Sequence, residues 1–149
     1  LSNRSSGTGT IQAIYNGSLV VGTSSISYNS IDNLSFTAPS TASTCYLINN
    51  TAVDPGSAMV ISNNTFGSNS VNYTGATGGS AAFTGINQSG VPLYLTISSN
   101  NFNNISIKTT GEINLIYANY VAPTGSKTIQ NNIITTGFAR TVAATMMSN

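Results

Sequence analysis

The sequence predicts an all-β protein that folds as a parallel β-helix, a solenoid in which each coil stacks on the one before it. The first observation behind this prediction is a six-residue phrase that recurs four times, with Ile at its first place, Asn at its fourth and Ile or Phe at its sixth. The copies begin at residues 26, 61, 97 and 129, and a period of this length is typical of repeat architectures. The second observation is that apolar residues occur in short runs, rich in β-branched and aromatic side chains, between clusters of Gly, Asn, Ser and Thr.

Each copy of the phrase is followed by two further runs of this kind, so a coil of about 35 residues is predicted to hold three short strands, and the chain about four coils. The paired runs are residues 33–36 and 45–50, 70–73 and 81–87, 105–107 and 113–119, and 137–139 and 141–145. The segment 11–16 resembles the third run of a coil, which predicts a partial coil ahead of the first phrase. We therefore divide the chain into a lead-in with part of a coil at 1–25 and the coils at 26–149, and we expect it to be a segment of a longer protein.

Equivalent positions of the phrase are predicted to form columns, because successive coils of a parallel β-helix lie about 4.8 Å apart. The first and sixth places predict two internal apolar columns. The fourth place predicts a column of Asn at a bend, where Asn tolerates left-handed backbone angles and can hydrogen-bond from coil to coil. The three columns are Ile26, Ile61, Ile97 and Ile129; Ile31, Phe66, Phe102 and Ile134; and Asn29, Asn64, Asn100 and Asn132.

The phrase Ile-Ser-x-Asn-x-Phe, found at residues 61–66 and 97–102, resembles the coil repeat of right-handed parallel β-helix proteins of the pectate-lyase-like superfamily. The composition, rich in Asn, Ser and Thr and poor in charge, resembles that of secreted bacterial surface adhesins, especially those of Bacteroidetes. The resemblance extends from residue 26 to about residue 145, and it implies a right-handed helix. It implies no single activity, because members of the superfamily include lyases, hydrolases, phage spikes and inert stalks.

Charge and composition exclude several classes of partner. Four basic and three acidic residues are the only charged side chains among 149, and the basic ones are dispersed, so neither nucleic acid nor an anionic membrane is an expected partner. No run approaches the roughly 18 apolar residues of a transmembrane helix. The single cysteine, Cys45, cannot form an internal disulfide. With 40 % hydrophobic residues and a net charge of +1, the chain is expected to fold rather than to remain disordered.

Catalytic chemistry finds little support in the sequence. There is no His, which rules out Ser-His-Asp and Cys-His mechanisms and, with one Cys, leaves no soft-metal site. Asp32, Asp54 and Glu112 occupy different offsets in their coils, so the pair of carboxylates that glycoside hydrolases need is not expected. Asp54 also precedes Pro55 and Gly56, which form a turn sequence. We therefore expect neither enzymatic activity nor a metal or cofactor.

Three tyrosines, Tyr94, Tyr117 and Tyr120, are candidates for a surface that binds glycans or proteins, because aromatic side chains are common at binding surfaces. All three are predicted at strand edges, and packing within the coils is the alternative for each. Neither end of the sequence shows a cap, and the open strand edges of a terminal coil need to be covered. Further coils of the same chain, or identical subunits, are thus the expected partners.

These observations predict a non-catalytic structural or adhesive module of an extracellular protein, at the cell surface or secreted, that serves as a β-helical stalk or as a binding surface. One alternative is a subunit of a self-assembling extracellular filament, a β-sandwich completed by a donated strand such as 11–21. A second alternative is the remnant of a carbohydrate-active β-helix enzyme. Turnover of an acidic polysaccharide that depends on Asp32, Asp54 or Glu112 would favour the enzyme.

Overall fold

The computed structural model describes residues 10–18, 21–38, 44–52, 56–73, 81–118 and 124–142. Within these residues the chain forms fourteen strands and no helix, which confirms the prediction of an all-β fold. The strands are β1 (Thr10–Asn16), β2 (Thr23–Ser27), β3 (Ser30–Asp32), β4 (Ser35–Ala38), β5 (Thr44–Asn50), β6 (Ala58–Ser62), β7 (Thr65–Gly67), β8 (Ser70–Tyr73), β9 (Phe83–Gln88), β10 (Tyr94–Ser98), β11 (Asn101–Lys108), β12 (Ile113–Ala118), β13 (Ser126–Gln130) and β14 (Ile133–Arg140).

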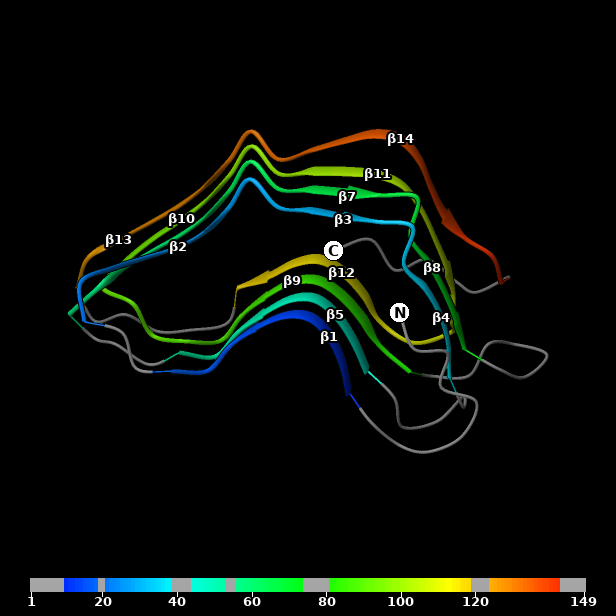
Figure 1. Ribbon diagram of the computed structural model, residues 1–149, viewed down its shortest axis with the longest axis horizontal. Coiled ribbons are helices and arrows are strands. Elements are labelled where there is room, and N and C mark those ends of the chain that lie inside the picture. The colour runs from blue at the N-terminus through cyan, green and yellow to red at the C-terminus, as the bar shows by residue number, and fades with distance from the viewer. Residues whose placement is uncertain are drawn as a thin grey trace.

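The strands form three parallel sheets that surround one core (Figure 1). Sheet A contains β1, β5, β9 and β12, sheet B contains β2, β6, β10 and β13, and sheet C contains the other six strands. One turn of the solenoid runs through sheets B, C and A in that order, for example along β2, β3, β4 and β5. About three complete turns are described. β1 lies ahead of them, as the predicted partial coil, and β13 and β14 form part of the fourth predicted coil.

Every strand pairing in the described part of the chain is parallel. This overturns the alternative of a β-sandwich, which needs antiparallel pairs. The segment 11–16 lies in β1, which pairs with β5 of the same chain and sets Ile11 opposite Cys45. In the last coil, Thr141 and Val142 are not in a strand, and the rest of the run predicted at 141–145 lies outside the described residues.

The two apolar columns of the phrase stand in register along the axis. Their order follows the strand pairs Ile26–Ile61–Ile97–Ile129 and Ile31–Phe66–Phe102–Ile134. The middle members are buried, and the rings of Phe66 and Phe102 stack with centroids 4.8 Å apart. The last members differ, since Ile129 is 50 % and Ile134 is 52 % exposed. The interior is therefore closed in the middle of the solenoid and open at its C-terminal coil.

Sheet A arches toward sheet C, so that its outer face is concave (Figure 1). Gly85 in β9 permits a close approach of the two sheets. A Cβ at this position would lie 2.6 Å from Cε1 of Phe102 and 2.6 Å from the carbonyl oxygen of Leu115. The aromatic column therefore packs directly against the backbone of sheet A.

Candidate functional site

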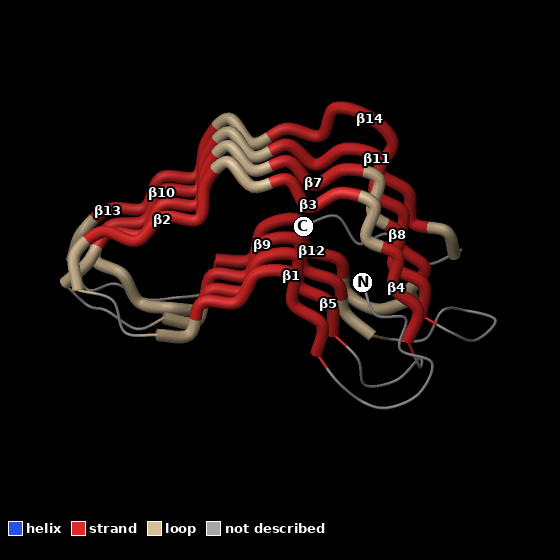
Figure 2. Tube along the Cα trace, viewed as in Figure 1, coloured by secondary structure: helices blue, strands red, loops and turns tan. Residues whose placement is uncertain are grey.

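The Asn column of the phrase forms a continuous hydrogen-bonded ladder at the bend between sheets B and C. Figure 2 shows these bends stacked one above another. The backbone N–H and Nδ2 of Asn29 both donate to Oδ1 of Asn64, at 3.0 and 2.9 Å. Asn64 donates in the same way to Asn100, at 3.1 and 2.9 Å, and Asn100 to Asn132, at 3.0 and 2.9 Å. Each Oδ1 thus accepts two bonds from the coil before it.

The side-chain amides of Asn64, Asn100 and Asn132 also donate to the coil that precedes each of them. Nδ2 of Asn64 donates to the carbonyl oxygen of Ile26 at 2.9 Å, and Nδ2 of Asn100 donates to that of Ile61 at 3.0 Å. Nδ2 of Asn132 repeats the contact one coil further on. Asn64 and Asn100 are completely buried, and buried amides are stable only when their hydrogen bonds are made. The column therefore fixes the register of one coil on the next.

The ladder asparagines do not themselves adopt the left-handed backbone angles expected of them. The positive φ falls on the residue immediately before each: Tyr28 (60°), Asn63 (54°), Ser99 (55°) and Asn131 (56°). The reason is geometric. The chain changes direction at the residue with positive φ, and the side chain of the following Asn then points inward. A second column with positive φ lies at the bend within sheet C, at Asn33, Ser68, Asn104 and Gly137.

Sequence reasoning missed two further groups of inward amides. Asn69 accepts the N–H of Leu34 at its Oδ1 and donates from Nδ2 to the carbonyl oxygen of Ile31, both at 2.9 Å. In sheet A, Asn16 donates to Asn50 and Asn50 donates to Gln88, both at 2.8 Å. The signal for the second group was the shared end of the runs 11–16 and 45–50, both of which close with Asn. The sequence gives no signal for Asn69, because the neighbouring coils carry Leu34 and Ile105 at the equivalent position.

The two ends of the ladder carry complementary groups. At the C-terminal end, the backbone N–H of Asn132 donates to no acceptor within the described residues, although its counterparts in Asn29, Asn64 and Asn100 each donate to the next Oδ1. At the N-terminal end, Oδ1 of Asn29 accepts no bond from the described part of the chain. One end therefore presents a donor where the other presents an acceptor.

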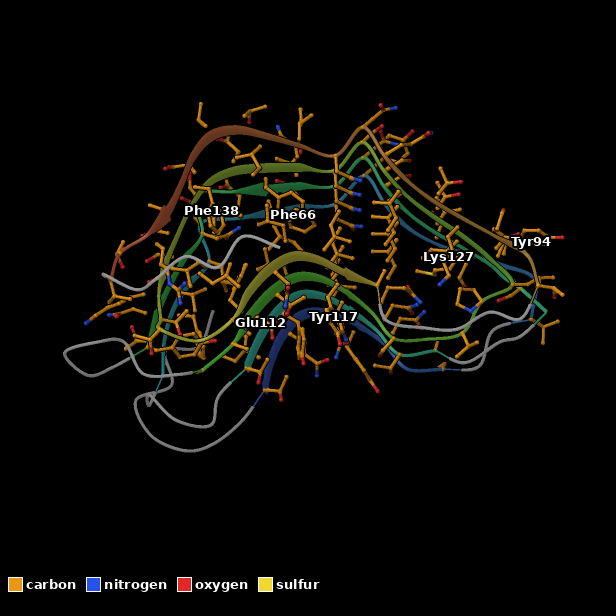
Figure 3. All side chains as sticks on the ribbon, turned by 180° about the vertical axis from the view of Figure 1, so that it is seen from behind. Phe66, Tyr94, Glu112, Tyr117, Lys127 and Phe138 are labelled. Carbon is orange, nitrogen blue, oxygen red and sulfur yellow. The ribbon has the colours of Figure 1, made fainter. Side chains whose placement is uncertain are left out.

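A shallow hollow lies on the concave outer face of sheet A. It has a volume of about 200 Å³ and is lined by Thr44, Tyr46, Ala82, Thr84, Asn87, Glu112, Asn114 and Tyr117. Figure 3 shows Glu112 and Tyr117 on this side of the sheet. The lining residues come from three successive coils, because Tyr46, Thr84 and Asn114 are opposite one another in the register, as are Asn87 and Tyr117.

The candidate surface tyrosines do not form one patch. Tyr117, 40 % exposed, lies in β12 of sheet A, whereas Tyr94, 52 % exposed, begins β10 of sheet B. Figure 3 shows the two well apart. Tyr120 lies outside the described residues. Tyr46, which sequence reasoning did not select, is the tyrosine that shares the hollow with Tyr117.

The acidic residues that the structure describes are separated by the fold. Asp32 is exposed in β3 of sheet C, and its Oδ1 accepts the N–H of Asn33 at 3.0 Å. Glu112 is exposed just before β12 of sheet A, and Asp54 lies outside the described residues. Within the described ranges, no three His, Cys, Asp or Glu residues come together as a metal site would need. The arrangement brings no second carboxylate to Glu112 from the described residues.

Two buried groups titrate far from neutrality. Burial raises the pKa of the Cys45 thiol from 9.0 to about 12. Burial, and then the neighbouring Cys45, raise the pKa of Tyr73, whose hydroxyl donates to the carbonyl oxygen of Ala82 at 2.8 Å. Both side chains are completely buried in the core. A protonated thiol shielded from solvent is a poor nucleophile, so Cys45 acts as a packing residue.

The chain matches no family model, and neither a curated protein nor a solved structure shows significant similarity to it. The fold and its hydrogen-bonding columns are therefore the basis for a functional proposal. The described residues contain no helix long and apolar enough to cross a membrane.

Proposed function

We propose that this chain is a non-catalytic structural module, a β-helical stalk segment that extends by stacking coil on coil with a second copy of itself or with further coils of its own chain. The observation that supports this most directly is the Asn ladder: within the described part of the chain, the backbone N–H of Asn132 has no acceptor and Oδ1 of Asn29 has no donor, and the two groups match. A coil added to the C-terminal end would continue the ladder in the geometry that joins the existing coils.

The apolar surface of the last coil supports the same proposal. Ile129 and Ile134 continue the buried columns, yet half of each side chain is exposed. A coil stacked on them would cover these side chains, and fully burying one such side chain contributes about 1.5–3 kcal/mol. The edge strands β13 and β14 would gain the parallel pairing that the inner strands already have.

We further propose that the helix is right-handed and pectate-lyase-like, and that it belongs to a secreted or cell-surface adhesin. Connections between parallel neighbours in one sheet, such as that from β2 to β6, are right-handed in about 98 % of cases. The chain carries only seven charged side chains, a composition similar to that of secreted bacterial surface adhesins.

The test is the association state of the purified chain, measured by sedimentation velocity over a range of concentrations. We expect association that increases with concentration. Ile134→Asp should abolish it, because the change places a charge in the stacking face. Ile133→Asp is the matched control: Ile133 is equally exposed, at 50 %, but it is opposite Asn101 on the outer surface.

A wild-type chain that remains monomeric at every concentration would contradict the proposal, as would equal effects of the two substitutions. The alternative of an enzyme remnant makes a different prediction. Hydrolysis or elimination of an acidic polysaccharide that disappears in Glu112→Gln or Asp32→Asn would favour it over a stalk.

A further inference from the structure

The hollow on the outer face of sheet A has a composition that the packing of the coils does not require. Outward positions of a β-helix face solvent, where any polar residue suffices. Here Tyr46 and Tyr117 lie at opposite ends of the hollow's lining, one in β5 and the other in β12, with one coil between them that contributes Thr84 and Asn87 from β9. Concave sites that combine aromatic surface with a few polar groups are typical of ligand binding.

The amides of this face are held in fixed orientations. Nδ2 of Asn87 donates to Oδ1 of Asn49 at 2.7 Å, and Nδ2 of Asn49 donates to Oε1 of Gln12 at 2.5 Å. Asn87 is 9 % exposed, and it is opposite Tyr117 in the register. An amide already fixed by its neighbours loses little conformational entropy when a ligand binds, which favours affinity.

The charge of the hollow restricts the class of ligand. Among the described residues that line it, Glu112 is the only ionisable group besides the two tyrosines, and none is Lys, Arg or His. An acidic ligand would meet a carboxylate with no cation to compensate it, and like charges brought together are unfavourable. A neutral ligand with many hydroxyl groups would find donors and acceptors in Thr44 and Asn114 and, deeper in the hollow, in Thr84 and Asn87, which are 5 % and 9 % exposed.

We propose that this hollow binds a neutral polysaccharide, whose pyranose rings pack their C–H faces on Tyr46 and Tyr117 while their hydroxyl groups hydrogen-bond to the amide and threonine side chains between them. The ligand would lie along the solenoid axis, because the lining residues come from three stacked coils. The hollow opens on the outer face of sheet A rather than along the strand edges at the ends of the solenoid, and its described lining comes from a single chain, so it forms without a second copy.

The test is affinity electrophoresis of the purified chain in native gels that contain one soluble neutral polysaccharide each: a β-glucan, a mannan, a xylan or a galactan. We expect at least one of them to retard the wild-type chain. Tyr117→Ala should weaken this binding about tenfold, which corresponds to about 1.4 kcal/mol. Tyr94→Ala is the matched control, since Tyr94 is a more exposed tyrosine on sheet B, and it should leave the retardation unchanged.

Circular dichroism checks that both variants keep the wild-type fold, and a gel that contains polygalacturonate tests the preference for neutral ligands. Three results would overturn the proposal. They are the absence of retardation by all four neutral polysaccharides, equal losses in the two tyrosine variants, and retardation by polygalacturonate as strong as by the best neutral polymer.

Discussion

At the scale of single residues, the buried ladder asparagines contribute most to the specificity of this fold. Asn100 donates to Asn132 and to the carbonyl oxygen of Ile61, and it accepts two bonds from Asn64. A buried polar group that loses its partner costs about 1–3 kcal/mol. The column is therefore sensitive to the loss of any inner member.

Asn100→Ala should lower the free energy of unfolding by about 3 kcal/mol, because it removes the donor to the carbonyl oxygen of Ile61 and the acceptor of the Asn64 backbone N–H. Urea denaturation measures the change. Asn72→Ala is the control: Asn72 is exposed in β8, and the change should cost less than about 0.5 kcal/mol. Comparable losses in the two variants would show that the ladder does not stabilise the fold.

Gly85 is predicted to resist even the smallest side chain. Gly85→Ala places a Cβ 2.6 Å from both the Phe102 ring and the Leu115 carbonyl oxygen, and overpacking of this kind costs about 1–3 kcal/mol. Gly67→Ala is the matched control, since its Cβ would meet only the side chain of Asp32, at 2.9 Å from Oδ1, which is exposed and can move. Thermal unfolding of the two variants should differ clearly, and equal melting temperatures would refute the close approach.

The buried thiol predicts a dependence of stability on alkaline pH. In the unfolded chain Cys45 loses its proton near pH 9.0, but in the folded protein it keeps the proton until about pH 12. The unfolded state therefore binds fewer protons between these values, and the free energy of unfolding falls as pH rises above 9. In Cys45→Ala, the decrease in the free energy of unfolding that begins near pH 9 should be smaller. The decrease that remains at higher pH should come from Tyr73. Urea midpoints that stay constant up to pH 11 in the wild type would contradict this prediction.

At the scale of elements, the strands differ in how completely they are covered. The inner strands β5, β6, β7, β8, β9, β10 and β11 have neighbours on both sides. Within the described residues, β2 and β13 are the edge strands of sheet B, and β1 and β12 are those of sheet A. Local opening is easier where fewer buried contacts are lost. The middle turns should therefore open only with the whole fold.

Amide hydrogen exchange tests this gradient. Backbone amides of β6 and β10 should exchange at least about a hundredfold more slowly than those of β13, because opening the inner strands requires loss of coils on both sides. Mass spectrometry of proteolytic fragments measures the exchange rate in each strand. Uniform protection across sheet B in a dilute, monomeric sample would mean that the edges are as stable as the centre.

The elements also show where sequence reasoning succeeds and where it fails. The phrase recurs with its period almost intact, so it predicted the parallel coils and the residues opposite one another, such as Ile61 and Ile97. The hollow of sheet A could not be predicted, because its residues share no motif. They come together only through the register of three coils and the curvature of the sheet (Figure 1).

At the scale of the whole molecule, the strands at one end of the solenoid are placed to stack on those at the other end of a second copy. The N-terminal end begins with β1 in sheet A, and the C-terminal end finishes with β13 in sheet B and β14 in sheet C. The described strands thus form a staircase rather than a flat-ended stack, and the sheet A strand of one copy would fit above β12 of another. Stacking by this route is head to tail, a heterologous contact that does not close on itself.

The backbone N–H groups of the Asn ladder all donate in one sense, toward the C-terminal coil. An assembly of such copies would have chemically unequal tips, and subunits would add at different rates to the two. A copy that carries Ile134→Asp could still join through its intact N-terminal face, and it would then block all further growth at that tip. A small fraction of this variant mixed into the wild type should therefore act as a chain terminator, shortening the assemblies far more than simple dilution would.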